Sequence, residues 1–148
     1  MTANQGNGFP MNPTMLRAAY VSNSIETMSP GRMIVALYER LALDLERAEQ
    51  AILASDPATA HECLLHAQAI VTELHDALDV EAWPAARSLK DIYVFLLFEL
   101  IASNVEKDSD RVAGCRSLVV PLRDAWNEAA GIVTSSGGSA VRSVGGSA

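Results

Sequence analysis

One stretch of sequence decides the fold, and it reads Ser29-Pro30-Gly31-Arg32-Met33-Ile34-Val35-Ala36-Leu37-Tyr38-Glu39-Arg40-Leu41-Ala42-Leu43-Asp44-Leu45. Ser29 is a favourable N-cap, because its side-chain oxygen can accept a hydrogen bond from a free amide in the first turn. Pro30 follows at the first helical position, where its missing N–H costs nothing. Apolar residues then recur in steps of three and four, at Ile34, Leu37, Leu41, Leu45, Ala48 and Ile52. This stripe predicts a helix over about 30–54 that must pack against other helices.

The same signals predict the next two helices. Asp56 and Pro57 repeat the combination of an N-cap and a proline, and they open a second helix over about 57–78. Its apolar residues alternate in steps of four and three. Pro84 cannot continue a preceding helix, so it separates the second helix from a third over about 84–107.

A fourth helix is predicted to begin at Asp108 or Asp110 and to extend to about residue 132. Pro121 lies inside it, but the apolar pattern continues across the proline, so we expect one helix that is kinked between Gly114 and Pro121. Four helices with short connections favour antiparallel neighbours. The sequence therefore predicts an all-α fold, an antiparallel up-down-up-down four-helix bundle with a short N-terminal cap helix packed outside it.

The 148 residues suggest one domain with two irregular ends. Residues 1–13 are rich in Asn, Gly and Pro and are expected to form a flexible N-terminal arm. Residues 14–133 are expected to form the helical bundle domain, with the cap helix over 14–21. Residues 134–148 are rich in Gly and Ser and are expected to be a disordered tail.

Composition excludes several function classes. The net charge of −7 argues against nucleic acid as a partner, because phosphate backbones require clustered Lys and Arg. The polar N-terminus does not resemble a secretory signal, and no apolar run approaches the roughly 18 residues of a membrane helix. We therefore expect no membrane insertion and a cytoplasmic (cytosolic) location. The two cysteines, Cys63 and Cys115, form no C-x-x-C motif and are expected to be reduced.

The sequence offers no argument for an enzyme, a cofactor or a metal site. A di-metal carboxylate bundle needs two Glu-x-x-His motifs and two further Glu residues, whereas Glu62 and His66 form a single pair four residues apart. The three histidines, His61, His66 and His75, are separated by five and nine residues and do not share one helix face. No nucleophile with a base at a readable spacing and no Gly-rich phosphate loop is present.

The third helix carries more apolar side chains than one core can bury. Ile92–Phe98 is apolar without interruption, and successive residues of a helix point about 100° apart. About half of these side chains must therefore face away from the core, where contiguous apolar surface usually marks an interaction site. In the alternative interpretation, the N-terminal segment covers them permanently.

The ordered set of motifs resembles the family of flagellin-specific export chaperones called FliS. The matching residues are Ala19-Tyr20, Asn23-Ser24, Thr27, Ser29-Pro30-Gly31, Leu37-Tyr38, Ala67–Leu74, Tyr93, Leu100-Ile101, Asn104 and Arg123-Asp124-Ala125-Trp126. The resemblance covers roughly residues 18–130 and implies the same bundle fold. It also implies that the chain binds the C-terminal region of flagellin, prevents premature polymerisation and delivers its cargo to a flagellar export gate protein.

In this family the segment around the Ala-Tyr motif can occupy the cargo surface of the free protein. From the resemblance and the apolar excess we predict these partner-binding residues: Met15, Leu16, Tyr20, Leu37, Tyr38, Leu41, Tyr93, Phe95, Leu97 and Phe98. Periodicity alone would instead place the tyrosines in or near the core. We expect a monomer or weak dimer. Two alternatives remain, a histidine phosphotransfer bundle, whose His-x-x-Lys-Gly-like motif is missing, and a regulatory bundle with an unknown partner.

Overall fold

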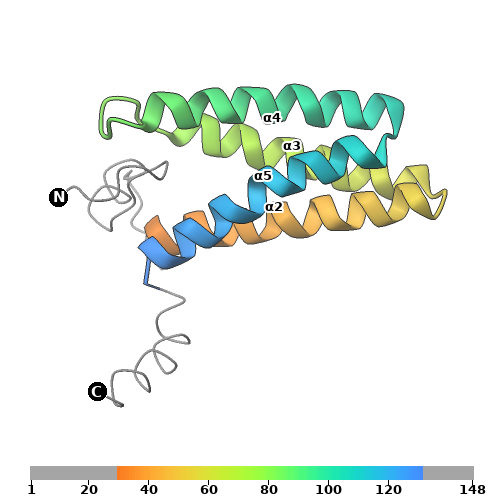
Figure 1. The fold of residues 1–148 in the computed structure, drawn as a ribbon, viewed down its shortest axis with the longest axis horizontal. Coiled ribbons are helices and arrows are strands. Elements are labelled where there is room, and N and C mark those ends of the chain that lie inside the picture. Colours follow the sequence, from red (N-terminus) through yellow and green to blue (C-terminus); the bar gives the residue numbers. More distant parts are fainter. Residues whose placement is uncertain (1–29, 132–148) are drawn as a thin grey trace, which may run out of the picture.

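The computed structural model describes residues 30–131, which form four helices and, within that range, no strand (Figure 1). The helices are α2 (Pro30–Leu53), α3 (Pro57–Ala77), α4 (Ala86–Glu106) and α5 (Ser109–Ala129). The all-α prediction is confirmed, and all eight helix ends lie within three residues of those predicted. The expected arm, cap helix and tail lie outside the described residues.

Two helices begin at capping aspartates, as their sequence indicates. The Asp56 carboxylate accepts a hydrogen bond from the Thr59 backbone N–H at 3.2 Å at the start of α3. The Asp108 carboxylate accepts from the backbone N–H groups of Asp110 and Arg111 at 3.0 and 3.2 Å at the start of α5. Each carboxylate satisfies amides that the first helical turn leaves free, so these two starts are fixed locally.

The start of α4 differs from the prediction, because the helix begins at Ala86 and not at Pro84. Trp83 is buried, and its carbonyl accepts a hydrogen bond from the Ala86 N–H at 2.9 Å. Pro84 and Ala85 therefore form a turn that carries the chain from the buried indole into the helix. At the other end, Lys107 adopts a left-handed conformation with φ of 51°, which ends α4 two residues before α5 begins.

The four helices pack as an antiparallel bundle in which each helix has two neighbours. Helix α2 packs extensively against both α3 and α5, and α4 packs against α3. The contact between α4 and α5 is the least extensive of the four. Figure 1 shows the reason, because α5 begins beside the end of α4 and crosses the bundle to finish beside the start of α2. The predicted four-helix bundle is confirmed, and its weakest seam lies between α4 and α5.

Four aromatic side chains lie close together in the core. Tyr38 of α2 and Tyr93 of α4 are completely buried, and their hydroxyl oxygens lie 2.7 Å apart, at hydrogen-bonding distance. The ring of Trp126 lies 6.2 Å from that of Tyr38 and 6.0 Å from that of Trp83, the latter in an edge-to-face arrangement. Burial raises the pKa of the Tyr38 hydroxyl well above its usual range, although hydrogen bonds with Tyr93 and Trp126 act in the opposite direction.

A buried carboxylate joins α2 to α3. Asp44 of α2 is 2% exposed, and its two oxygens bind different partners. One accepts a hydrogen bond from Arg40 Nε at 3.3 Å, and the other contacts Nδ1 of His66 on α3. A buried charge requires such pairing, and His66 has the structural role of supplying it from the neighbouring helix.

Pro121 lies inside a single continuous α5, so the prediction of one fourth helix is confirmed. The proline ring is exposed on the outer face, and the Ser117 hydroxyl, one turn earlier, donates to the Gly114 carbonyl at 2.8 Å. Proline cannot donate to the carbonyl four residues before it, so α5 lacks one backbone hydrogen bond here. The bend that we expect between Gly114 and Pro121 remains a prediction.

Candidate partner-binding surface

Helix α4 divides its apolar residues between the core and the outside of the bundle. Its buried side chains include Leu89, Tyr93, Leu96 and Leu100, which repeat in steps of four and three. They occupy one side of the helix and account for its packing against the core. The exposed apolar side chains of α4 are Val94, Phe95, Phe98, Ile101 and Val105. The sequence run Ile92–Phe98 is thus apolar on all sides because two separate apolar surfaces share the same helix.

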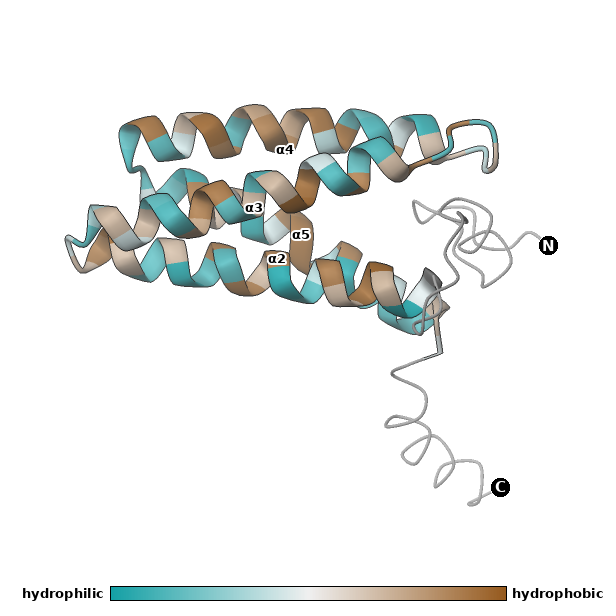
Figure 2. Cartoon of the chain, turned by 180° about the vertical axis from the view of Figure 1, so that it is seen from behind, coloured by the Kyte–Doolittle hydropathy of each residue, from teal (hydrophilic) through white to brown (hydrophobic). Residues whose placement is uncertain are grey.

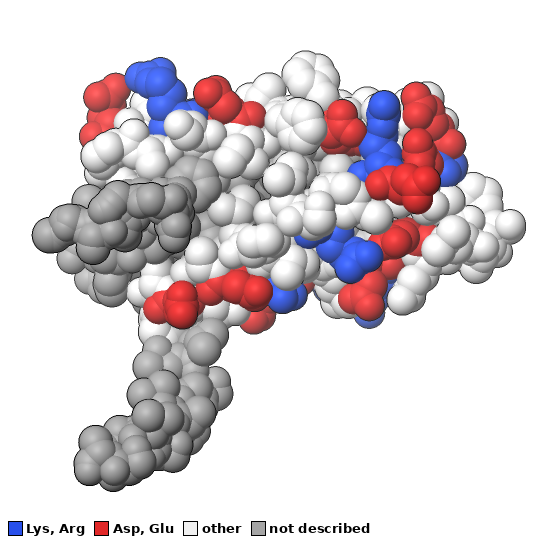
Figure 3. All heavy atoms as spheres, viewed as in Figure 1, with Lys and Arg blue, Asp and Glu red and all other residues white. Residues whose placement is uncertain are grey.

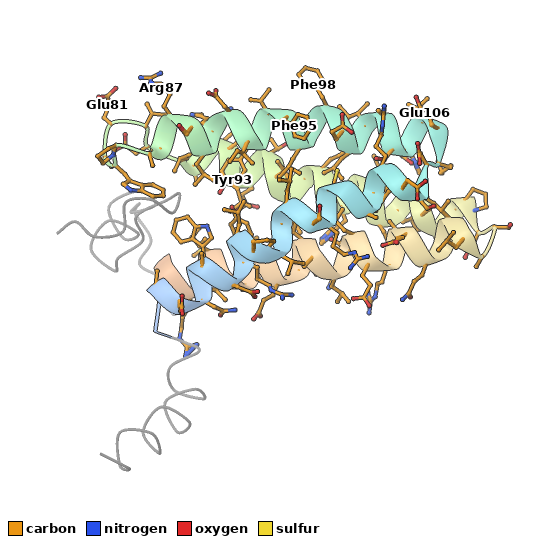
Figure 4. All side chains as sticks on the ribbon, in the orientation of Figure 1. Glu81, Arg87, Tyr93, Phe95, Phe98 and Glu106 are labelled. Carbon is orange, nitrogen blue, oxygen red and sulfur yellow. The ribbon has the colours of Figure 1, made fainter. Side chains whose placement is uncertain are left out.

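Four of these exposed residues form what we call the outer stripe of α4, namely Val94, Phe98, Ile101 and Val105. Their spacing places them within an arc of about 60°, on the side opposite the core. Phe98 is 68% exposed and Val105 79% exposed, and Figure 4 shows Phe98 pointing away from the bundle. Figure 2 shows apolar segments along α4, and in Figure 3 uncharged side chains gather over its middle while charged groups lie near both ends.

A second exposed apolar area follows the weak seam between α4 and α5. An ion pair joins the two helices near the end of α4 and the start of α5, with Arg111 Nε 3.4 Å from Glu99 Oε1. Phe95 lies one turn before Glu99 and is 51% exposed, and Leu118 lies two turns after Arg111 on the same side of α5 and is also exposed. Because the two helices are antiparallel, Phe95 and Leu118 both lie along the seam. The seam therefore extends the apolar surface from the outer stripe toward α5.

The residues predicted to bind a partner fall into four groups. Phe95 and Phe98 are exposed on α4, and Leu37 and Leu97 are partly buried against the core. Tyr38, Leu41 and Tyr93 are completely buried, so they support the surface from within and offer no area to a partner in this conformation. Met15, Leu16 and Tyr20 lie outside the described residues. Among the predicted residues within 30–131, only Phe95 and Phe98 are exposed, and both lie on α4.

Sequence reasoning missed four residues of this surface: Val94, Ile101, Val105 and Leu118. Three of them complete the outer stripe, and the signal that could have found them is the spacing of four, three and four from Val94 to Val105. That spacing is obscured because the core residues of α4 repeat with the same period. Leu118 carries no such signal, since its exposure depends on how α5 crosses the bundle.

The described residues contain no cluster of metal-ligating side chains. Within 30–131, no group of three or more His, Cys, Asp or Glu side chains could hold a metal ion. Both cysteines are free, and burial raises the pKa of each thiol, that of Cys115 to about 12. His61 lies at hydrogen-bonding distance from Asn104, and His75 from Asp76. Over the same range, no helix has the length and apolar character needed to cross a membrane.

Comparison with known proteins assigns the chain to a family. Residues 12–133 match the family described as Flagellar protein FliS. The chain belongs to the FliS family. The flagellar secretion chaperone FliS of Bacillus subtilis (strain 168) is 32% identical over 111 residues, which cover 75% of this chain and 83% of that protein. The predicted resemblance is confirmed, and the family is one of flagellar secretion chaperones.

The FliS match includes all four described helices and therefore the whole apolar surface of α4 and α5. A chaperone acts by binding another chain, and exposed apolar area is the feature that such binding requires. Among residues 30–131, most of the exposed large apolar side chains lie on the outer stripe of α4 and along its seam with α5, whereas Leu43, Leu53 and Leu65 are exposed elsewhere.

Proposed function

We propose that this chain is a cytoplasmic flagellar export chaperone that binds the C-terminal region of flagellin. By covering that region it prevents premature polymerisation, and it then delivers the cargo to the flagellar export apparatus. One observation supports the proposal above all others: a chain of the FliS family carries a contiguous row of exposed apolar side chains on α4. Water-exposed apolar rows of this kind are typical of surfaces that bind another protein.

The proposed complex uses helix-in-groove recognition. The outer stripe extends from Val94 to Val105, which corresponds to about 16 Å or three turns of a partner helix. An amphipathic cargo helix can place its own apolar face on this stripe, with Phe98 as the anchor. A second cargo segment can pack along the seam at Phe95 and Leu118. If the cargo folds as it binds, the ordering of its backbone offsets part of the binding free energy.

The proposed mode of action is stoichiometric and needs no catalysis or cofactor. Burial of apolar surface alone holds the cargo. The cargo is released at the export apparatus, where an export gate protein is the second partner. No specific observation on the described residues favours the histidine phosphotransfer alternative. His66, the histidine with the best-defined environment, is engaged by the buried Asp44 carboxylate.

Titration calorimetry of the full chain tests this function. The ligand is flagellin encoded in the same genome, and the control ligand is the same flagellin without its C-terminal region. We expect a one-to-one complex with the complete protein only, and a negative heat-capacity change from apolar burial. Absence of binding at tens of micromolar would refute the proposal.

Two matched variants locate the binding surface. Full burial of a phenylalanine contributes about 1.5–3 kcal/mol, so the exposed two-thirds of Phe98 should contribute about 1–2 kcal/mol to cargo binding. Phe98→Ala should therefore weaken binding about 5- to 30-fold. Leu53→Ala is the control, because Leu53 is 69% exposed but lies at the end of α2, outside the proposed surface. Equal effects of the two substitutions would place the cargo elsewhere.

A further inference from the structure

The outer stripe of α4 continues at its N-terminal end into two charged residues. Arg87 lies seven residues before Val94, and Asp91 lies seven residues before Phe98, which is about two helical turns in each case. Both charged residues are exposed, and Figure 4 shows Arg87 and Phe98 on the same side of the helix, away from the bundle. We call the resulting set of six positions the extended row: Arg87, Asp91, Val94, Phe98, Ile101 and Val105.

The extended row has the spacing of a coiled-coil seam. Its positions are separated in turn by four, three, four, three and four residues. This alternation keeps one narrow face of a helix in contact with a single partner helix. From Arg87 to Val105 the row covers 18 residues, or about 27 Å. The partner shape that fits the row is therefore one helix of about five turns, with its own side chains at the same spacing.

The two charged members of the row have weak partners within the chain. Arg87 Nη2 lies 4.0 Å from Glu81 Oε2, and the two side chains are 73% and 81% exposed, so this pair contributes little. Asp91 is exposed and forms no ion pair with another residue of 30–131. A helix that covers the extended row would also cover both charges, and a covered charge requires a partner. The helix therefore needs a carboxylate opposite Arg87 and a cationic side chain opposite Asp91.

Electrostatics also favours one direction for this helix. The N-terminus of a helix carries a partial positive charge and the C-terminus a partial negative charge, so two neighbouring helices attract when they are antiparallel. The cations Arg87 and Lys90 lie in the first two turns of α4, and the exposed carboxylates of Glu106 and Asp110 lie at its other end. An antiparallel helix would place its negative end beside the cations and its positive end beside these carboxylates.

We infer that the extended row receives one amphipathic helix antiparallel to α4, in which a cation and then a carboxylate follow the apolar residues. The inference rests on the proposed function, because the helix is then a segment of the flagellin cargo, and it adds the direction and charge pattern of that segment. From N- to C-terminus the segment has four apolar residues in steps of four, three and four. A Lys or Arg opposite Asp91 comes next, and a Glu or Asp opposite Arg87 follows it. A shift of the helix by one step would cover these charges without partners, so the pair also fixes the register.

Three synthetic peptides, each about 21 residues long, test this pattern by fluorescence anisotropy with the full chain. All three have the same composition and the same row of four leucines. The first has Lys and then Glu after the leucines, the second exchanges this Lys and Glu, and the third has Glu and then Lys before the leucines, as a parallel helix would require. We expect the first peptide to bind about 3- to 10-fold more tightly than either of the others. Equal affinities of the first and second peptides, or a third peptide that binds at least as tightly as the first, would overturn the inference.

Exchange of the two charges in the chain tests the pairing from the other side. The double variant Arg87→Glu and Asp91→Lys should reverse the preference, so that the second peptide binds more tightly than the first. The matched control is the double variant Arg47→Glu and Asp76→Lys, which exchanges exposed charges on α2 and α3, outside the extended row. It should leave the preference for the first peptide unchanged, and circular dichroism checks that both double variants are folded. A preference that survives the exchange at Arg87 and Asp91 would show that these residues do not face the peptide.

Paramagnetic broadening in NMR spectra measures the direction of the bound helix. A nitroxide at the C-terminal end of the first peptide should broaden the backbone amide signals of Arg87 and Asp91 more than that of Val105. Stronger broadening at Val105 would mean that the helix is parallel to α4 and would overturn the inference.

Because the peptides are synthetic, this inference and the proposed function can fail separately. If the C-terminal region of flagellin binds the chain but the three peptides bind equally or not at all, the inference is wrong and the proposed function stands. If the peptides behave as expected but flagellin does not bind, the proposed function is refuted, whereas the direction and charge pattern inferred for a helix on the extended row stand.

Discussion

Removal of either buried tyrosine hydroxyl should destabilise the bundle, and removal of both should cost little more than removal of one. The Tyr38 and Tyr93 hydroxyls lie 2.7 Å apart and are completely buried, so each substitution to phenylalanine deletes the hydrogen bond between α2 and α4. A buried polar group that loses one of its hydrogen-bond partners costs up to about 1–3 kcal/mol. We therefore expect Tyr38→Phe and Tyr93→Phe each to lower the free energy of unfolding by about 1–3 kcal/mol, which corresponds to about 4–15 °C in Tm.

Urea denaturation followed by circular dichroism provides the double-mutant cycle. In the double variant neither residue of this pair carries a hydroxyl. Its free energy of unfolding should therefore fall by about 1–2 kcal/mol less than the sum of the two single losses. Ser103→Ala is a control, because the buried Ser103 hydroxyl donates only to the Glu99 carbonyl of its own helix, at 2.7 Å. It should cost less than about 1 kcal/mol. If the loss of unfolding free energy in the double variant equals the sum of the two single losses to within about 0.5 kcal/mol, the coupling of the two tyrosines across the bundle is refuted.

Three further results are expected. Pro121→Ala should raise Tm and leave cargo binding nearly unchanged, because an interior proline costs up to about 3 kcal/mol and its exposed ring fills no core space; a lower Tm would show that the proline is required where it stands. His66→Ala should cost up to about 3 kcal/mol by urea denaturation, more than Asp44→Ala, because it leaves the 2% exposed Asp44 carboxylate without one of its partners, whereas Asp44→Ala removes the buried charge and leaves a His66 ring that is 49% exposed; a smaller loss for His66→Ala would contradict the pairing described for this carboxylate. A thiol reagent at pH 8 should modify Cys63 well before Cys115, since a pKa of about 12 leaves only about one Cys115 in ten thousand as thiolate; equal rates would show that Cys115 is not held in the core.

The helices themselves could be predicted from the sequence because their signals are local. Asp56 and Asp108 cap helices by bonding amides two or three residues away, and Pro57 tolerates the first helical position for reasons within its own ring. The start of α4 could not be placed correctly, because it depends on the burial of Trp83 against the rest of the core. Capping depends on residues within one helical turn, whereas the burial of Trp83 depends on its packing against Trp126, more than 40 positions away.

The candidate surface shows the same division. The apolar excess of Ile92–Phe98 was sufficient to predict that α4 faces both a core and something else, and the exposure of Phe95 and Phe98 agrees with it. Periodicity already favoured a position for Tyr93 in or near the core, but its contact with Tyr38 and the outward position of Val105 became known only from the packed helices. A helix that is apolar on all sides has no preferred face of its own. The face of α4 that turns inward is the one that buries the most apolar area against α2, α3 and α5. That area depends on how all four helices pack together.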